Sequence, residues 1–491
     1  MTVQRLRGLD AAFFYLETPS QHMHVTAMML LDPETGTGAA ATAAESADQQ
    51  MIAEAVTATL LDRLIGQDAF RKRMVEAPLG ITHPAWVDVA RVRPHEHVRF
   101  LTLPAPGTID QLAKVVGEIA GVALDRSRPL WELWTITGVE GGRFGVVLKV
   151  HHAMLDGVSG LEVMGRLFTP EPEPGASGRS RATVAEPTEP SVLWLAASAV
   201  LSAMRAPVSV VQTLMHTARA LPPFLRDLIE GASAVVPRIL PFSAPRSTLN
   251  HALTPERAVA FGRVPLASVK EIKRAYGVTV NDVVLAACTR ALGDYLRAHG
   301  EPPLRPIVAS VPVSEHVASD AGQLSNRVSA MLVGLPVHLT VVEDIVTFIR
   351  TQSAGAKDRY ASLGPAMLAD WAELAPPALF SGAAGLYSRW QLAERLPSPH
   401  SIVISNVPGP AFVLYAGPAR LVAAYPLGPV LEGAGINISV LSYAGSVDIG
   451  LITCPRAVAE PSEIARGFER SVEDMLASAR QLSSHRPSVA S

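Results

Sequence analysis

The segment Thr169–Pro190 constrains the fold most strongly, because it separates two long stretches that can each bury a core. It is rich in proline, glycine, serine and charged residues, a composition typical of a linker. The chain of 491 residues is also too long for one ordinary domain. We therefore expect an N-terminal domain over 1–168, a linker with connecting helices over 169–245, a second domain over 246–480, and a disordered tail over 481–491.

Both halves combine helical and strand patterns. In the first half, Thr108 is a plausible N-cap for a run of apolar residues at helical spacing. An alternating strand pattern from Leu130 to Val139 is then joined by Gly141-Gly142 to a second, apolar strand. In the second half, Thr279–Gly300 has the pattern of a helix, and Gly435–Thr453 that of a β-hairpin. These patterns predict the α/β (α+β) class, with two domains of similar size.

The composition excludes several kinds of partner and compartment. Hydrophobic residues make up 48% of the chain and the net charge is −3, which argues against a nucleic-acid partner. Cys288 and Cys454 lie in apolar runs and are expected to be buried thiols in a reducing compartment. The start of the chain lacks the pattern of a secretion signal, and the most apolar segment, Val192–Met204, is too short to span a membrane. We expect a cytoplasmic protein that adheres to membranes.

The stretch RFGVVLKVHHAMLDGVSG, from Arg143 to Gly160, contains the strongest candidate for chemistry. Successive side chains of a strand point to opposite faces, so one of His151 and His152 should face a cavity while the other packs behind it. An imidazole in a cavity is suited to act as a general base at neutral pH. Asp156 could hold the loop or orient the imidazole, and Gly157 permits an unusual backbone conformation or a close approach of a ligand.

Two other interpretations of the histidine pair remain open at this point. The pair could be structural, with both rings satisfied by backbone groups. Histidine and aspartate four residues apart also resemble metal ligands, but Gly157 and the strand-to-turn setting disfavour a helical presentation. No further cluster of histidine and cysteine supplies more ligands, which also disfavours a metal site.

The sequence HHAMLDG matches the HHxxxDG signature and resembles the bacterial bifunctional wax ester synthase/diacylglycerol acyltransferase family. That family belongs to the chloramphenicol acetyltransferase-like superfamily, whose peptide-synthetase condensation domains share the signature. Further blocks similar to this family occur in the same order over nearly the whole chain. They are Leu6–Val25, Pro129-Leu130-Trp131, Asn281-Asp282, Ser405–Pro410 and Gly435–Gly445.

The resemblance implies two chloramphenicol acetyltransferase-like domains with mixed sheets, joined by a helical linker, with the active site in a channel between them. It implies acyl-CoA as co-substrate and donor, diacylglycerol or a long-chain alcohol as acceptor, and neither a metal nor a bound cofactor. His152 would deprotonate the acceptor hydroxyl, and His151 would support it from behind. Asp156 would shape the loop, and Gly157 would keep the channel open.

Five further residues are candidates for the substrate channel, each with a structural alternative: Trp131, Asn281, Asp282, Asn437 and Ser439. Trp131 is more often a core residue, and Asn281 and Asp282 suit the first turn of a helix. Asn437 and Ser439 point to one face of a strand, at the channel or in solvent.

Two other functions compete with triacylglycerol or wax ester synthesis. One is a condensation-type acyltransferase acting on carrier-bound acyl groups, and the other is a weakly active lipid-binding paralogue. The apolar segment Val192–Met204 also predicts peripheral association with the inner membrane or with lipid droplets.

Overall fold

The computed structural model describes most of both predicted domains. The described residues are 4–6, 8–33, 43–76, 83–155, 160–173, 244–314, 328–363 and 377–484. Asp156, Gly157, the segment Val192–Met204, nearly all of the predicted linker and the end of the predicted tail lie outside them. Within these ranges, no helix is both long enough and apolar enough to cross a membrane.

The first of two six-stranded sheets has the order β12-β13-β2-β7-β6-β5. β5 runs parallel to β6, and the other neighbours are antiparallel, so the sheet is mixed. The two strands predicted on either side of Gly141-Gly142 are confirmed as β6 and β7. The strands are β2 (His24–Asp32), β5 (Val98–Thr102), β6 (Trp131–Val139), β7 (Arg143–His151), β12 (Tyr415–Ala416) and β13 (Ala419–Leu427).

The second sheet has the order β10-β9-β11-β14-β15-β8 and is also mixed, because β11 runs parallel to both β9 and β14. The predicted hairpin is confirmed as β14 and β15. Its turn places Ala444 at φ 43° and Gly445 at φ 90°, as a tight hairpin turn requires. The strands are β8 (Ala258–Pro265), β9 (Ile307–Ser314), β10 (Val328–Leu335), β11 (Ile402–Pro408), β14 (Ile436–Tyr443) and β15 (Ser446–Thr453).

The first sheet includes two strands from beyond the predicted domain boundary. β12 and β13 come from the segment predicted as the second domain, yet β13 pairs with β2 of the first sheet from Arg420–Asp32 to Leu427–Thr26. A division of the chain into contiguous domains therefore misses this exchange. One buried cluster accordingly draws on both sheets, with Met28 and Val147 from the first and Ile452 from the second.

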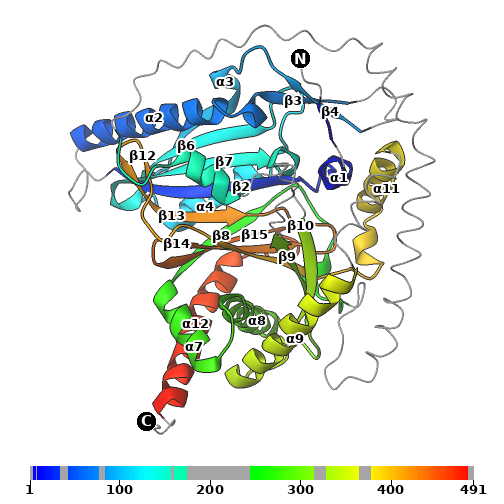
Figure 1. Ribbon diagram of the computed structural model, residues 1–491. Helices are drawn as coiled ribbons and strands as arrows, with labels where there is room; N and C mark the ends of the chain where they lie inside the picture. The colour runs from blue at the N-terminus through cyan, green and yellow to red at the C-terminus, as the bar shows by residue number, and fades with distance from the viewer. Residues whose placement is uncertain are drawn as a thin grey trace.

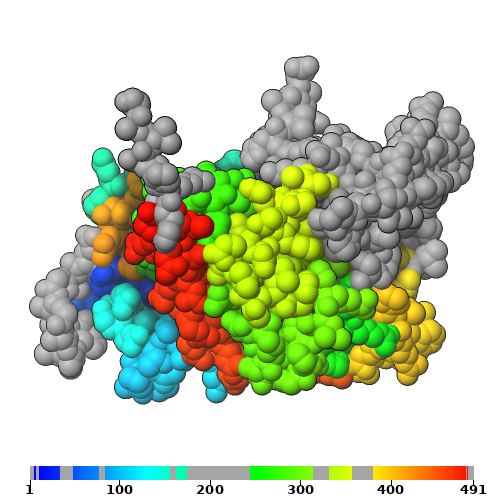
Figure 2. All heavy atoms as spheres, turned by 90° about the horizontal axis from the view of Figure 1, so that it is seen from below, coloured from blue at the N-terminus to red at the C-terminus, as the bar shows by residue number. Residues whose placement is uncertain are grey.

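Helices cover the outer face of each sheet, and one helix lies between the two sheets (Figure 1). On the second sheet, α8 packs between α12 and α9, and Figure 2 shows α12 in red and α9 in yellow across this face. The helices used below are α1 (Gly8–Leu16), α2 (Ala43–Ile65), α4 (Ile109–Ala120), α5 (Gly160–Leu167), α7 (Leu266–Tyr276), α8 (Val280–Ala298), α9 (Val342–Leu363), α11 (Pro377–Arg389) and α12 (Pro461–Ser484).

The helix between the sheets is α4, which contacts β6 and β7 on one side and β8 on the other. Thr108 forms the predicted N-cap, in a capping box with Gln111. Gly117 allows the close approach to the second sheet, because a Cβ there would lie 2.6 Å from the carbonyl oxygen of Arg257. Cys288 and Cys454 are both buried and free, as expected from their apolar surroundings.

Candidate active site

The histidine pair lies where β7 ends. His151 is the last residue of the strand, and His152 begins a single 3-10 turn, His152–Leu155. The backbone N–H of His151 donates to the carbonyl of Leu130 (2.9 Å), while that of His152 donates to the carbonyl of Met23 (2.8 Å). Because the strand ends between the two residues, both rings lie on the side of α1. The expectation that the two rings point to opposite faces assumed a continuing strand, and the strand does not continue past His151.

Two consecutive phenylalanines of α1 stack on the two consecutive histidines. The ring of Phe13 lies 4.1 Å from that of His152, and the ring of Phe14 lies 4.2 Å from that of His151, nearly parallel to it. From the sequence, this part of α1 was expected only to resemble the family, and no contact with the histidines was predicted for it. Its only local signal is the adjacent aromatic pair near the start of the chain.

His152 is the more accessible member of the pair. Its side chain is part-buried, whereas His151 is 1% exposed. Burial lowers the pKa of His152 to about 4, and a hydrogen bond to its own backbone opposes this lowering. Nδ1 has no hydrogen-bond partner among the described residues. The neutral ring keeps a lone pair on one of its two nitrogens at neutral pH.

His151 is held in the opposite way. Its Nδ1 accepts a hydrogen bond from the backbone N–H of Ala153 (3.2 Å), which places the proton of the neutral ring on Nε2. That Nε2 lies 3.9 Å from a carboxylate oxygen of Glu17. Burial, followed by the charges of Arg126 and His152, holds the pKa of His151 well below its ordinary value. The ring is thus a neutral buried brace for the turn that begins at His152.

Glu17 and Arg126 form an ion pair beside His151, and neither residue was predicted from the sequence. Arg126 donates to Glu17 through two nitrogens, at 2.6 and 3.1 Å, and its guanidinium lies over the ring of Phe14. The carboxylate and the guanidinium neutralise each other beside His151. No sequence signal links these residues, because they lie 109 positions apart.

A second buried polar cluster caps the end of α4 beside the pair. His22 and His24 each direct Nε2 to a backbone carbonyl, of Gly121 and Ala120 respectively, at 3.0 and 2.9 Å. The ammonium of Lys149 is fully buried and donates to the carbonyls of Ile119 and Val122. Burial lowers the pKa of Lys149, and it lowers that of His22 to about 4. These donors satisfy helix carbonyls that would otherwise lack partners.

Trp131 and Asp282, two of the five channel candidates, have structural roles. Trp131 is fully buried, its indole N–H donates to the carbonyl of Phe70 (3.0 Å), and its ring stacks on His97. Asp282 closes a capping box with Thr279 at the start of α8. Both contacts correspond to the structural alternatives given above.

The other three candidates lie on the second sheet or its covering helix. Asn281 is part-buried in the first turn of α8. Asn437 and Ser439 are 3% and 4% exposed, which makes the solvent-exposed alternative wrong. The hydroxyl of Ser439 donates to Asn437, whose amide donates to the carbonyl of Pro429 in the loop after β13. A role for these residues in a substrate channel stays a prediction, as do the roles of Asp156 and Gly157.

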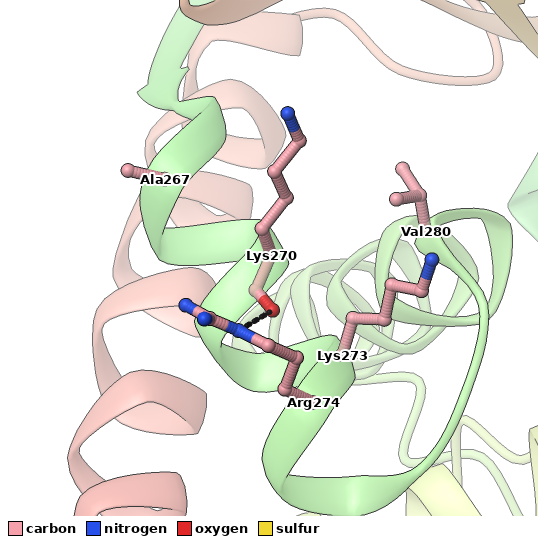
Figure 3. A pocket seen from close by; sticks show the side chains of 5 residues that line it. All are labelled: Ala267, Lys270, Lys273, Arg274 and Val280. Atoms are coloured by element: carbon pink, nitrogen blue, oxygen red, sulfur yellow. Dashed lines mark hydrogen bonds between the residues drawn. The ribbon is translucent and has the colours of Figure 1, made fainter.

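A basic pocket of about 430 Å³ lies on α7 and the start of α8, lined by Lys270, Lys273 and Arg274 (Figure 3). It is remote from the histidines. A series of contacts connects α7 to one end of the first sheet. Pro265, just before α7, pairs with Ser446, which follows the hairpin turn after Tyr443. The hydroxyl of Tyr443 donates to the carbonyl of Leu421 on β13. Leu421 pairs with the end of β2 opposite His24. Since a nine-residue strand is about 30 Å long, the start of α7 lies near the end of the first sheet that is opposite to the histidine pair.

Across the described ranges, no group of three or more histidine, cysteine, aspartate and glutamate residues is arranged to hold a metal ion. The expectation that the site uses no metal stays a prediction.

Nearly the whole chain matches the models of one protein family. Residues 6–284 match the wax ester synthase/diacylglycerol acyltransferase catalytic domain, and residues 324–476 match the C-terminal domain of the same family. A Mycobacterium tuberculosis protein named as a diacylglycerol O-acyltransferase is 35% identical over 479 residues, covering 96% of this chain and 90% of the relative. Another from the same species is 33% identical over 95% of this chain and 94% of the relative.

Solved structures agree with this assignment. The wax ester synthase/diacylglycerol acyltransferase from Marinobacter aquaeolei VT8 is 25% identical and superposes with a TM-score of 0.68, covering 97% of this chain and all of that one. A trichothecene 15-O-acetyltransferase from Fusarium sporotrichioides is 12% identical with a TM-score of 0.53, covering 97% and 95% of the two chains, and shares the fold. The predicted two-part acetyltransferase-like fold is thus confirmed.

Proposed function

Because the chain belongs to the wax ester synthase/diacylglycerol acyltransferase family, we propose that His152 is the general base of its acyl transfer. The protein is an O-acyltransferase that esterifies diacylglycerol, and long-chain alcohols serve as the alternative acceptor. The donor is a long-chain acyl-CoA, which acts as a co-substrate, and the reaction requires no bound cofactor.

In this reaction Nε2 of His152 accepts the proton of the acceptor hydroxyl as the oxygen attacks the thioester carbonyl. The new C–O bond gives a tetrahedral oxyanion, which hydrogen-bond donors must stabilise. The oxyanion then collapses, the C–S bond breaks, and the CoA thiolate takes the proton from the imidazolium. The products are an ester and CoA, and His152 returns to its neutral form. Its low pKa keeps Nε2 unprotonated at neutral pH and makes this return favourable.

The observation that carries the assignment is the difference between the two imidazoles. His151 is fully buried and its Nδ1 accepts the backbone N–H of Ala153, whereas His152 is part-exposed and its Nδ1 has no hydrogen-bond partner among the described residues. Asparagine is a matched replacement at both positions, because its amide can substitute for Nδ1 but offers nothing at Nε2.

The test measures CoA release from palmitoyl-CoA with diacylglycerol as acceptor. His152→Asn should lower kcat by about 10²–10⁴-fold, the usual contribution of a general base. His151→Asn keeps an acceptor for the N–H of Ala153 and should retain most of kcat. Full activity of His152→Asn would overturn the assignment, and an acceptor screen would separate triacylglycerol from wax ester synthesis.

The protein is proposed to act in the cytoplasm, associated peripherally with the inner membrane or lipid droplets, where its acceptors reside. Support comes from α11, which packs against α1 beside the histidines and lies at the edge of the molecule (Figure 1). Leu386 and Trp390, one helical turn apart, are 45% and 57% exposed, and Arg389 beside them is exposed. Apolar and cationic side chains together suit an interface with anionic lipid. Recovery of all the protein in the soluble fraction of lipid-loaded cells would contradict this proposal.

A further inference from the structure

The segment between α1 and β2, residues 17–23, joins the turn of His152 to the C-terminal half of the chain. At its end, the carbonyl of Met23 accepts the backbone N–H of His152 at 2.8 Å. At its start, Glu17 accepts from Arg126 and also from the backbone N–H of Met23 (3.4 Å). Any displacement of this segment therefore reaches the backbone of His152 through one hydrogen bond.

Gln21 is the side chain that crosses between the two halves. It is 4% exposed, and both ends of its amide are used. Nε2 donates to the carbonyl of Leu16 at the end of α1 (2.8 Å), and Oε1 accepts the backbone N–H of Glu432 (2.6 Å). Glu432 lies in the loop between β13 and β14, so one amide ties the helix of Phe13 to the C-terminal half.

Two further contacts hold the same segment from the C-terminal half. Arg257, which precedes β8, is 8% exposed and donates to the carbonyl of Ser20 (2.6 Å). The hydroxyl of Ser388, on α11, donates to the carboxylate of Glu432 (2.7 Å) and accepts from Thr18 (3.4 Å). The segment is thus fixed by residues of three elements that lie more than 230 positions away in the sequence.

We propose that Gln21 is a positioning residue that sets the place of the base by tying residues 17–23 to the C-terminal half. This inference rests on the proposed role of His152. Gln21 and Met23 are only two residues apart, so a displacement of the anchor is passed on to the carbonyl that holds His152. Gln21 touches neither the substrate nor the reacting atoms and acts only through this carbonyl. A displacement of about 1 Å at a catalytic group is enough to lower a rate about 10²-fold.

The first test is Gln21→Met, which keeps the length and volume of the side chain and removes both hydrogen bonds. With palmitoyl-CoA and diacylglycerol, kcat should fall about 10–100-fold, whereas KM for palmitoyl-CoA should stay within about twofold. The matched control is Thr57→Val, which removes a buried hydrogen bond between Thr57 on α2 and Thr135 on β6 inside the first half. This control should leave kcat unchanged even though it lowers the melting temperature.

The second test is the pH dependence of Gln21→Glu. A neutral carboxyl can donate to the carbonyl of Leu16 and accept from Glu432, whereas the carboxylate cannot donate. Burial raises the pKa of such a carboxyl, so kcat relative to wild type should recover as the pH falls below about 6. His152 remains an unprotonated base there, since its pKa is about 4. A purely structural role for Gln21 gives no such recovery.

Ser388→Ala is the variant to use if the Gln21 variants do not fold, because Ser388 is only part-buried. It removes one contact behind Glu432 and should lower kcat severalfold with KM unchanged. The proposal is overturned if Gln21→Met and Thr57→Val lower kcat equally, or if KM rises instead of kcat falling. Failure of the proposed function would appear separately, as full activity of His152→Asn beside wild type.

Discussion

The stacking of Phe13 on His152 predicts the acid limb of the pH profile. A general base works only in its unprotonated form, so activity is lost as the pH falls through the pKa of His152. Burial is the largest cause of the low pKa of His152, about 4, and Phe13 covers one face of the ring at 4.1 Å. Phe13→Ala lets water reach that face, which favours the imidazolium and raises the pKa.

The size of this effect follows from the cost of burial. The difference between the ordinary value of 6.5 and a pKa of about 4 corresponds to about 3 kcal/mol against the imidazolium. Phe13 covers one of the two faces of the ring, so its removal should return about a third to a half of that energy. The acid limb of kcat/KM should therefore move from about pH 4 to about pH 5.

The assay measures kcat/KM for palmitoyl-CoA between about pH 3 and pH 8, which reports the free enzyme. The matched control is Phe14→Ala, because Phe14 stacks on His151 and not on His152. The control should lower stability and leave the acid limb in place. An acid limb that stays at the wild-type position in Phe13→Ala, or moves to lower pH, would refute the reasoning, as would an equal displacement in both variants.

Three further predictions concern stability. Trp131→Phe removes the hydrogen bond to Phe70 and some buried volume, so it should lower the free energy of unfolding, measured in urea, by about 1–3 kcal/mol. KM for palmitoyl-CoA should stay unchanged, and a large rise in KM would instead place Trp131 at the substrate. Lys149→Met leaves helix carbonyls without a donor and should cost about 3 kcal/mol, seen as a lower Tm, and an unchanged Tm would contradict the cap. Asp282→Ala breaks a capping box and should cost about 1 kcal/mol in urea, whereas Asn281→Ala next to it should cost less.

Those parts of the fold that depend on neighbouring residues could be predicted from the sequence. The hairpin turn at Ala444-Gly445 and the N-cap at Thr108 are local patterns, and both are confirmed. β13 could not be placed in this way, because its partner β2 is almost 400 residues away and apolar alternation does not identify a partner strand. The division into two contiguous domains is incomplete for the same reason.

In the candidate site, too, local features could be predicted from the sequence and long-range contacts could not. The adjacent histidines and the glycine after them form a short motif, so the sequence points to them directly. The contacts that hold the pair, from Phe13, Glu17 and Met23, come from elsewhere in the chain and have no pattern of their own. Trp131 shows the opposite case, since it belongs to a block of the resemblance and yet its ring and N–H are fully used in the core.

The place of the two histidines now follows from the geometry of the elements that meet there. Had β7 continued past His151, strand alternation would have put the two rings on opposite faces of the sheet, and one helix could not have contacted both. The strand ends at His151, so both rings lie on the side of α1. Consecutive residues of a helix point about 100° apart, so Phe13 and Phe14 can each stack on one ring. The position of α1 therefore determines where both imidazole rings lie. The end of α1 is itself held in place by the C-terminal half, through the side chain of Gln21.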